Sequence, residues 1–443
     1  MSLISSISGI RGTIGGKVGE NLTPIDIVKY VSAFITLLKE NEPNKTLRIV
    51  VGRDARISGE MVSSIVCGTI QSMGADVIDV GLSTTPTVEM SVVSHKADGG
   101  IIITASHNPM QWNALKLLRS NGEFVSGADG VRIQQWVKEA NFTYAEAKKL
   151  GHYSFYENAI ADHIEKILAL EWVDVDAISR ANFNVAVDAV NSTGGIAIAQ
   201  LLKKLGVKRS TILNGEPTGV FAHNPEPLPE HLAEISNLID KNSFHVGFVV
   251  DPDVDRLAIV MENGEMFGEE YSLVAIADYI LQNQKGNTVS NLSSTRALRD
   301  ISEKYGVSYA AAAVGEVNVV EKMKETNAII GGEGNGGIIL PALHYGRDAL
   351  VGIALFLTYM AKTKKSPVQI KSQFPSYFIS KNKIELKPET NVPHILDCVA
   401  EKYKAYSVNR IDGVKVDFED NWIHLRASNT EPIIRIYAEA TNM

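Results

Sequence analysis

The chain has 443 residues, a length that predicts three or four domains. Of these residues 45% are hydrophobic and 21% are charged, a composition typical of a soluble globular protein. Its formal net charge of -8 argues against a nucleic-acid partner, because phosphate backbones are bound by surplus Lys and Arg. The two cysteines are far apart and support neither a disulfide framework nor a zinc site. No signal-peptide pattern and no apolar stretch of membrane-spanning length occurs, so we expect a cytoplasmic protein without membrane contact.

Three stretches of the chain share one pattern, in which a β-branched strand is followed by a polar turn and a helix. The first runs from a strand at 47–51 through GRDARISG to a helix near 60–73, and a second strand, ADVIDVG, follows. The second stretch has a strand at 183–187 and a helix at 196–204, and the third passes from NTVSNLSST into a helix near 296–305. Strands alternating with helices of this length predict βαβ-type layers and three related α/β domains.

Candidate domain boundaries fall near residues 150, 245 and 370. They predict domains at 1–150, 151–245, 246–370 and 371–443. The last boundary lies in KTKKSPVQIKSQFPS, which is polar and contains proline, as linkers often do. The segment after it alternates strand and helix patterns and predicts a small α+β domain.

The first motif that could carry chemistry is Thr104-Ala-Ser-His-Asn-Pro109, directly after the strand GGIIIT. Reactive residues are commonly displayed at strand ends in α/β folds, and Asn108-Pro109 favours a turn that would project the Ser106 hydroxyl away from the sheet. An ordinary polar turn is the alternative. A serine hydrolase is disfavoured because the Gly-x-Ser-x-Gly elbow is absent.

The second motif is Asp251-Pro-Asp253-Val-Asp255-Arg256, between the strands FHVGFVV and LAIVM. Three carboxylates at alternate positions repel one another unless a cation or proton separates their charges, and such hard oxygen ligands suit Mg²⁺. An EF-hand loop is excluded, because Arg256 stands where that loop needs Gly and the flanks are strands. The motif also resembles the nucleophile loop of haloacid-dehalogenase phosphatases, in which Asp251 would accept the phosphoryl group. That pattern has Thr or Val where Asp255 stands.

Two further loops suit a phosphorylated sugar. The glycine-rich loop at 331–337 carries Glu333 and Asn335, and a proline follows where a dinucleotide-binding helix would begin. Close backbone approach and a carboxylate acceptor suit a polyhydroxyl ligand. The loop RASNTEP at 426–432, with Arg435 just beyond, combines two guanidinium groups, hydroxyls and backbone amides that could bind a phosphate dianion. Plain polar turns remain the alternative for both loops.

Together these four loops, in this order, resemble the α-D-phosphohexomutase family. The resemblance includes SGIRG near the N-terminus and GEPTGVFAHNPEPLPEHL in the second repeat, and it covers essentially the whole chain. It implies three related α/β domains with mixed sheets and a C-terminal α+β domain similar to the TATA-box-binding protein, arranged around a central cleft.

The resemblance also implies how each loop acts. Ser106 carries the phosphoryl group, and Asp251, Asp253 and Asp255 hold one Mg²⁺ per active site together with an oxygen of that phosphate. The implied catalytic residues are Ser106, Arg11, Lys116, His107 and Arg256, with Lys116 suggested for proton transfer. The implied substrate-binding residues are Glu333, Asn335, Arg426, Ser428, Asn429, Thr430 and Arg435. A hexose 6-phosphate and a hexose 1-phosphate would interconvert through a bisphosphate, with hexose 1,6-bisphosphate as activator.

The sugar loop departs from the family pattern, because Asn335 replaces a common Ser and Gly337 replaces a common His. The neighbouring loop VGEVNVV, with Glu316, also differs from that of typical members. Length and the compact four-domain plan favour glucosamine 6-phosphate as the small-molecule partner, with a phosphomannomutase/phosphoglucomutase as the alternative. A haloacid-dehalogenase-type phosphatase and a silent sugar-phosphate-binding protein are weaker alternatives. We expect a monomer or a homodimer.

Overall fold

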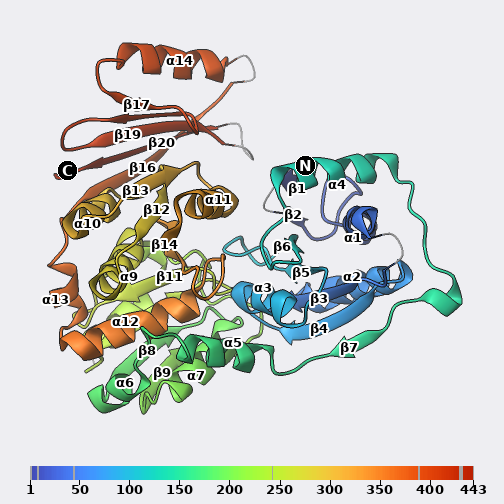
Figure 1. Ribbon diagram of the computed structural model, residues 1–443, viewed down its shortest axis with the longest axis horizontal. Coiled ribbons are helices and arrows are strands. Elements are labelled where there is room, and N and C mark those ends of the chain that lie inside the picture. Colours follow the sequence, from blue (N-terminus) through green and yellow to red (C-terminus); the bar gives the residue numbers. More distant parts are fainter. Residues whose placement is uncertain are drawn as a thin grey trace. The chain divides into compact units, whose positions relative to one another are not determined.

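The computed structural model describes residues 2–442, apart from 7–8, 43–44, 242, 388–389 and 429–432. It divides into two compact units. Figure 1 labels their helices and strands. Unit 1 comprises Met1–Gly268 and Gly337–Val368, and unit 2 comprises Glu269–Gly336 and Gln369–Met443. Among the described residues, no helix combines the length and the hydropathy needed to cross a membrane.

The first sheet of unit 1 has the strand order β1-β2-β6-β5-β3-β4-β7. Its strands are β1 (Ile4–Ser6), β2 (Gly9–Thr13), β3 (Arg48–Arg53), β4 (Asp76–Leu82), β5 (Gly99–Ile103), β6 (Trp112–Arg119) and β7 (Tyr153–Phe155). The helices around it are α1 (Pro24–Asn41), α2 (Gly59–Ser72), α3 (Thr85–Ser94) and α4 (Gly127–Glu139). Strand β5 pairs in parallel with β3 and antiparallel with β6, so the sheet is mixed.

Both faces of this sheet are covered, which explains its uninterrupted apolar strands. Ile49 and Val51 of β3 pack into a core with Phe34 of α1, whereas Val50 packs into a second core with Val88 of α3. Side chains alternate between the two faces of a strand, so each apolar residue in the run is buried on one face or the other.

The second sheet of unit 1 has the strand order β11-β10-β8-β9. Its strands are β8 (Asn184–Asp188), β9 (Arg209–Leu213), β10 (Val246–Val250) and β11 (Leu257–Val260), and its helices are α5 (Ala159–Leu168), α6 (Val175–Ala181), α7 (Gly194–Lys204), α8 (Ala233–Asp240) and α12 (Ala349–Thr363). Val249 packs with Ile235 of α8, whereas Phe248 contacts Phe356 of α12 in a T-shaped geometry. Because β10 pairs in parallel with β8, the expected domain boundary near residue 245 is wrong, and the aspartate loop belongs to the second sheet.

Unit 2 contains a parallel arrangement β13-β12-β14 and a five-stranded antiparallel sheet. The parallel strands are β12 (Asn287–Asn291), β13 (Tyr309–Ala312) and β14 (Ala328–Glu333), with helices α9 (Glu269–Asn283), α10 (Ala297–Tyr305) and α11 (Glu316–Thr326). The antiparallel sheet has the order β16-β20-β19-β18-β17, formed by Phe378–Glu385, Ile433–Ala440, Trp422–Ala427, Val414–Asp417 and Ser407–Asn409. Helix α14 (Val392–Lys402) packs on β18 and β19.

The remaining described elements are short: β15 (Gly337–Ile339), α13 (Pro367–Lys371), η1 (Ala147–Lys149) and η2 (Pro229–His231). The predicted α/β class with mixed sheets and a C-terminal α+β segment is confirmed.

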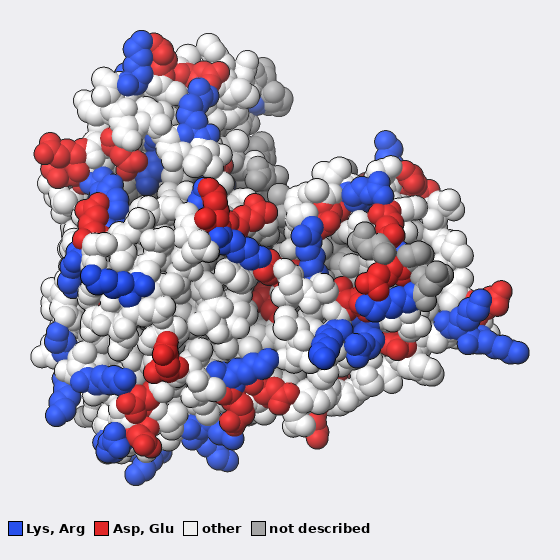
Figure 2. Space-filling view, in the orientation of Figure 1, with Lys and Arg blue, Asp and Glu red and all other residues white. Residues whose placement is uncertain are grey.

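Lys and Arg side chains are interspersed with Asp and Glu on the face that Figure 2 shows. Exposed ion pairs of this kind, such as Lys204 with Glu165, contribute roughly 0–1 kcal/mol each, so buried contacts carry most of the stability.

Candidate active site

Ser106 lies in the turn directly after β5, and its backbone has a left-handed φ of 49°. Its amide N–H donates to Thr104 Oγ1 at 3.0 Å, and its own hydroxyl donates to Asp251 Oδ2 at 2.7 Å. Ser106 and Asp251 are 145 positions apart in the sequence, and the fold places the second-sheet loop directly against the first-sheet turn. A serine hydroxyl therefore faces a buried carboxylate.

The three aspartates of the loop between β10 and β11 are fully buried, and one carboxylate oxygen of each lies within 4.8 Å of the others. Asp251 Oδ1 accepts the backbone N–H groups of Asp255 and Arg256, both at 3.2 Å. Asp253 Oδ2 accepts from the Thr85 hydroxyl at 2.6 Å. Between them, Val254 has a left-handed φ of 63°, which is unusual for a β-branched residue and lets the short loop turn so that all three carboxylates converge.

The donor set of this loop fits a small divalent cation. Oδ1 of Asp253 and Oδ1 of Asp255 are buried and accept no hydrogen bond from a described residue. A buried carboxylate oxygen without a partner is costly, and a hard cation that takes oxygen ligands would satisfy both atoms. Among the described residues one other group, His163 with His344 and Asp348, has side-chain atoms close enough to hold a metal, but its imidazoles bond directly to Asp348.

Basic side chains surround the aspartates. Lys116 Nζ lies 2.7 Å from Asp253 Oδ2 and 3.3 Å from Asp255 Oδ2. Arg347 Nη2 donates to Asp255 Oδ2 at 2.7 Å. Arg11 reaches the serine turn by donating to Asn108 Oδ1 at 3.4 Å. These cations offset the negative charge that the three carboxylates concentrate in a buried volume.

Burial and neighbouring charges shift the pKa values of the site residues in different directions. Burial, reinforced by the charges of Asp253 and Asp255, raises the pKa of Asp251 well above its ordinary value. Burial also opposes charge on Asp253, but the Lys116 ammonium outweighs it and lowers the pKa of Asp253. Burial and the positive charge of Arg256 lower the pKa of His107 well below its ordinary value, so its imidazole is neutral. His107 Nδ1 lies 3.4 Å from Ser106 Oγ.

Arg256 and Glu226 complete this part of the site. Arg256 Nη1 lies 3.6 Å from Glu226 Oε1, and His107 Nε2 lies 4.0 Å from the same oxygen. The structure therefore brings together, in unit 1, the predicted residues Ser106, Arg11, Lys116, His107, Asp251, Asp253, Asp255 and Arg256.

Sequence reasoning did not assign roles to Thr85, Arg347 or Glu226, although each contacts this cluster. Glu226 lies within the segment GEPTGVFAHNPEPLPEHL, which belongs to the family resemblance, and Arg347 follows Gly346. A charged residue beside a glycine or proline turn would have been the only local signal. Thr85 had none, because an N-terminal threonine of a helix is common.

The predicted sugar loop lies in unit 2, where Glu333 ends β14. Glu333 Oε1 accepts from Asn291 Nδ2 at 2.9 Å and from the Gly315 amide at 3.1 Å. The next amide, of Gly334, donates to Ser294 Oγ at 2.9 Å, and Asn335 follows in the turn. The carboxylate is thus held in place by two donors at a strand end.

The predicted phosphate-binding loop is also in unit 2. Arg426 of β19 and Arg435 of β20 are directly opposite each other in the antiparallel register, and Ser428 follows β19. Like charges in opposing positions destabilise a sheet unless an anion or acid lies between them. Arg426 Nη1 lies 3.6 Å from Asp412 Oδ2. Asn429 and Thr430 lie outside the described residues.

Four domain families of phosphoglucomutases/phosphomannomutases match the chain. They are α/β/α domain I over 4–144, domain II over 161–264, domain III over 269–377 and the C-terminal domain over 387–443.

Relatives and solved structures match at almost full length. A phosphoglucomutase/phosphomannomutase of Thermococcus kodakarensis is 35% identical and covers 97% of this chain and 94% of its own. A phosphoglucosamine/phosphogalactosamine mutase of Sulfurisphaera tokodaii is 31% identical, covering 99% and 96%. The crystal structure of a phosphoglucomutase/phosphomannomutase family protein of Burkholderia thailandensis has the same fold, with a TM-score of 0.85 at 24% identity, covering 99% of this chain and 94% of that chain.

These matches agree with the serine turn, the aspartate loop and the basic side chains around them, and they show an enzyme of the isomerase class that acts as a phosphohexomutase. The chain belongs to the α-D-phosphohexomutase family.

Proposed function

We propose that this phosphohexomutase converts glucosamine 6-phosphate to glucosamine 1-phosphate through a phosphorylated Ser106. The assignment of Ser106 as the nucleophile rests on one observation: its hydroxyl donates to Asp251 at 2.7 Å. Asp251 belongs to the loop of three buried aspartates. Two further oxygens of that loop accept no hydrogen bond from a described residue, so a cation and a phosphate could be held side by side at the serine.

Asp251, Asp253 and Asp255 would hold Mg²⁺, together with an oxygen of the Ser106 phosphate. Bound there, Mg²⁺ supplies positive charge that neutralises the transferring phosphoryl group. A phosphoserine carries about −1.5 to −2 charges near neutral pH, and Arg11 and Lys116 offset what remains.

In the first transfer the bond from phosphorus to Ser106 Oγ breaks as a bond forms to the free hydroxyl of the hexose monophosphate. The sugar hydroxyl loses its proton, and a hexose 1,6-bisphosphate results. The bisphosphate turns over and returns its other phosphoryl group to Ser106, so the same bisphosphate acts as activator. Burial disfavours the charge on Lys116, but Asp253 and Asp255 outweigh it and raise the pKa of Lys116. Its ammonium form therefore lies beside Asp253 and Asp255. We assign proton transfer to it: the ammonium gives a proton to Ser106 Oγ as the bond to phosphorus breaks, and the resulting amine takes the proton that the sugar hydroxyl loses.

Residues of unit 2 would bind the rest of the substrate. The Glu333 carboxylate would accept hydrogen bonds from sugar hydroxyls, and the Asn335 amide would both accept hydrogen bonds from them and donate to them. The non-reacting phosphate would be held by Arg426, Ser428, Asn429, Thr430 and Arg435. The opposed positions of Arg426 and Arg435 on neighbouring strands support this, because a phosphate dianion between them would relieve their repulsion.

The choice of sugar has two candidates. Glucosamine phosphate is supported by the 31% identical Sulfurisphaera relative, which is named for amino-sugar phosphates. A phosphomannomutase/phosphoglucomutase activity is supported by the 35% identical Thermococcus relative. We further propose that the enzyme is cytoplasmic, acts as a monomer or homodimer, and keeps the predicted boundaries near residues 150 and 370.

The test is to incubate the Mg²⁺-loaded enzyme with glucosamine 6-phosphate, glucose 6-phosphate or mannose 6-phosphate, each with a trace of the matching bisphosphate, and to follow ³¹P NMR. We expect the 1-phosphate signal to grow fastest from glucosamine 6-phosphate. Faster conversion of glucose or mannose would contradict that choice and favour the second candidate. Full mutase activity in Ser106→Ala would contradict the phosphoserine mechanism.

A further inference from the structure

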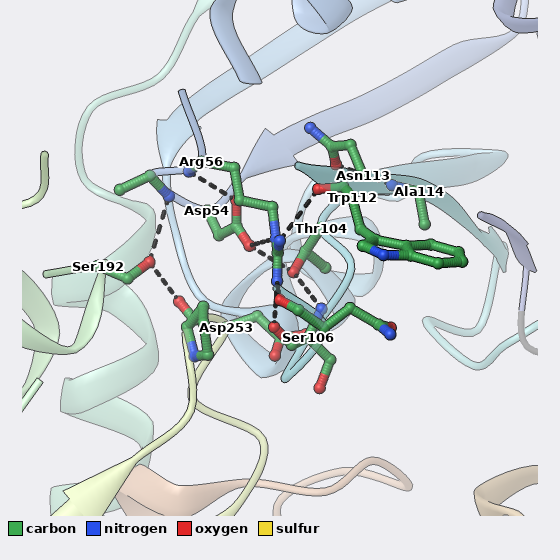
Figure 3. A network of polar contacts seen from close by, with 12 residues as sticks. Asp54, Arg56, Thr104, Ser106, Trp112, Asn113, Ala114, Ser192 and Asp253 are labelled. Carbon is green, nitrogen blue, oxygen red and sulfur yellow. Dashed lines mark hydrogen bonds and ion pairs between the residues drawn. The ribbon is translucent and has the colours of Figure 1, made fainter. Parts of the chain in front are cut away.

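Arg56 is fully buried in the loop between β3 and α2, and its guanidinium binds the turn that carries Ser106 (Figure 3). Nη2 donates to the backbone carbonyls of Ser106 at 2.5 Å and Asn108 at 2.6 Å. Nη1 donates to the carbonyls of Pro109 at 2.8 Å and Trp112 at 3.0 Å. One planar cation thus holds three carbonyls of the serine turn and the carbonyl of the first residue of β6, which a side chain with a fork of five N–H donors can do.

Asp54 holds this guanidinium in its orientation. Asp54 Oδ2 accepts from Arg56 Nε at 3.0 Å, and Oδ1 accepts from the Arg56 amide at 3.0 Å. The same Oδ2 accepts from the Thr104 hydroxyl at 2.6 Å, and Thr104 Oγ1 in turn accepts from the Ser106 amide. The serine turn is therefore bound through Ser106's amide at one end and through its carbonyls at the other.

Ala55, which stands between Asp54 and Arg56, connects this segment to the aspartate loop. The Ala55 amide donates to Ser192 Oγ at 3.2 Å, and the Ser192 hydroxyl donates to the carbonyl of Pro252 at 2.7 Å. Thr193 Oγ1 donates to the same carbonyl at 2.9 Å. Three consecutive residues, 54–56, thus contact the nucleophile turn directly and reach the loop of the aspartates through Ser192.

The conformation of the nucleophile gives these contacts a consequence. Ser106 has a φ of 49°, in the left-handed region, which is unfavourable for a residue other than glycine and persists where surrounding contacts impose it. Without the guanidinium, four carbonyls would lose their charged donor. The turn could then relax, and the Ser106 hydroxyl would leave its position 2.7 Å from Asp251.

We infer that Arg56 is a positioning residue that sets the distance between Ser106 and the aspartate loop, acting through backbone carbonyls and not through substrate. This inference rests on the proposed role of Ser106 as the phosphoryl carrier. It predicts that a change at Arg56 alters the rate of phosphoryl transfer more than the affinity for the sugar phosphate, because the sugar-binding residues are left intact.

The test compares Arg56→Lys with Arg53→Lys, a change of the same kind three positions earlier. Arg53 donates to the carbonyl of Asp54 and makes no contact with the serine turn that the structure records. A lysine ammonium has three N–H donors, too few for the four carbonyls and the Asp54 carboxylate that the Arg56 side chain binds. We expect Arg56→Lys to lower kcat about 100-fold, as misplacement of a reacting group by 1 Å can do, with KM unchanged within about threefold. The ³¹P signal of phosphoserine should shift in Arg56→Lys and stay in place in Arg53→Lys.

Ser192→Ala provides a second variant if Arg56→Lys does not fold, because it removes the link from Ala55 to Pro252 without changing charge. We expect a kcat lowered about 10-fold at unchanged KM. A kcat equal to that of wild type in whichever of the two variants folds, or a loss confined to KM, overturns the inference. Ser106→Ala separates this from the proposed function: an active Ser106→Ala removes the phosphoserine mechanism, whereas an inactive Ser106→Ala with a fully active Arg56→Lys removes only the positioning role.

Discussion

Replacing Asp253 by Asn tests whether the aspartate loop is a metal site, by a measurement that does not depend on turnover. Mg²⁺ at about 100 times its Kd should stabilise the folded enzyme by about 2.7 kcal/mol. Unit 1 contains about 300 residues, and the entropy of unfolding per residue then converts this free energy to a rise in Tm of about 4 °C.

The baseline of the variant follows from the contacts of Asp253. Its Oδ2 accepts from Lys116 and Thr85, and Oδ1 accepts no hydrogen bond from a described residue. Breaking a buried ion pair costs about 3 kcal/mol or more, so the metal-free variant should melt about 5 °C lower than wild type. Having lost an anionic ligand, it should gain almost nothing from Mg²⁺.

Thermal denaturation with and without saturating MgCl₂ measures both effects. Asp188→Asn is the matched control, because Asp188 is equally buried, ends a strand of the same sheet and lies outside the aspartate loop. It should lose stability but keep the full Mg²⁺ shift. An equal shift in Asp253→Asn and wild type, or none in wild type, would refute the assignment.

Three further results are expected. Burial disfavours charge on His344, but two neighbouring carboxylates outweigh it and raise its pKa to about 10. Its imidazolium therefore stabilises the fold fully below about pH 6.5, the pKa of histidine in the unfolded chain, and this contribution is lost as the pH rises to about 10. Between these two pH values the Tm of wild type should fall by more than the Tm of His344→Gln. A Cβ at Gly334 would lie 1.8 Å from Glu270 Oε2, so Gly334→Ala should lower the free energy of unfolding by about 1–3 kcal/mol and raise KM; an unchanged Tm would contradict the clash. Thr85→Val removes the hydroxyl 2.6 Å from Asp253 and should cost about 1.5–3 kcal/mol in chemical denaturation, together with a lower kcat; wild-type values for both would show that this hydrogen bond is not needed.

Much of the local structure followed from the sequence. The helix expected near 60–73 is Gly59–Ser72, and the strand expected at 183–187 is Asn184–Asp188. The aspartates were expected between two apolar strands, and they lie between β10 and β11. Periods of two and 3.6 residues, turn residues and strand ends are local properties, so a single sequence contains them.

The sequence by itself determined the α/β layers, the serine turn and the one loop that carries three carboxylates, because each depends on neighbouring residues. Only the tertiary structure decided that β10 pairs with β8, which places that loop in the second sheet of unit 1. It also brought Thr85 and Arg347 to the aspartate loop, although each is 92 or more positions away from the aspartate it contacts. The Arg56 guanidinium was likewise brought to the serine turn. Strand order and the partners of buried polar groups are settled by the packing of the whole chain, since any strand can satisfy the same hydrogen bonds and only the shared core selects its neighbour.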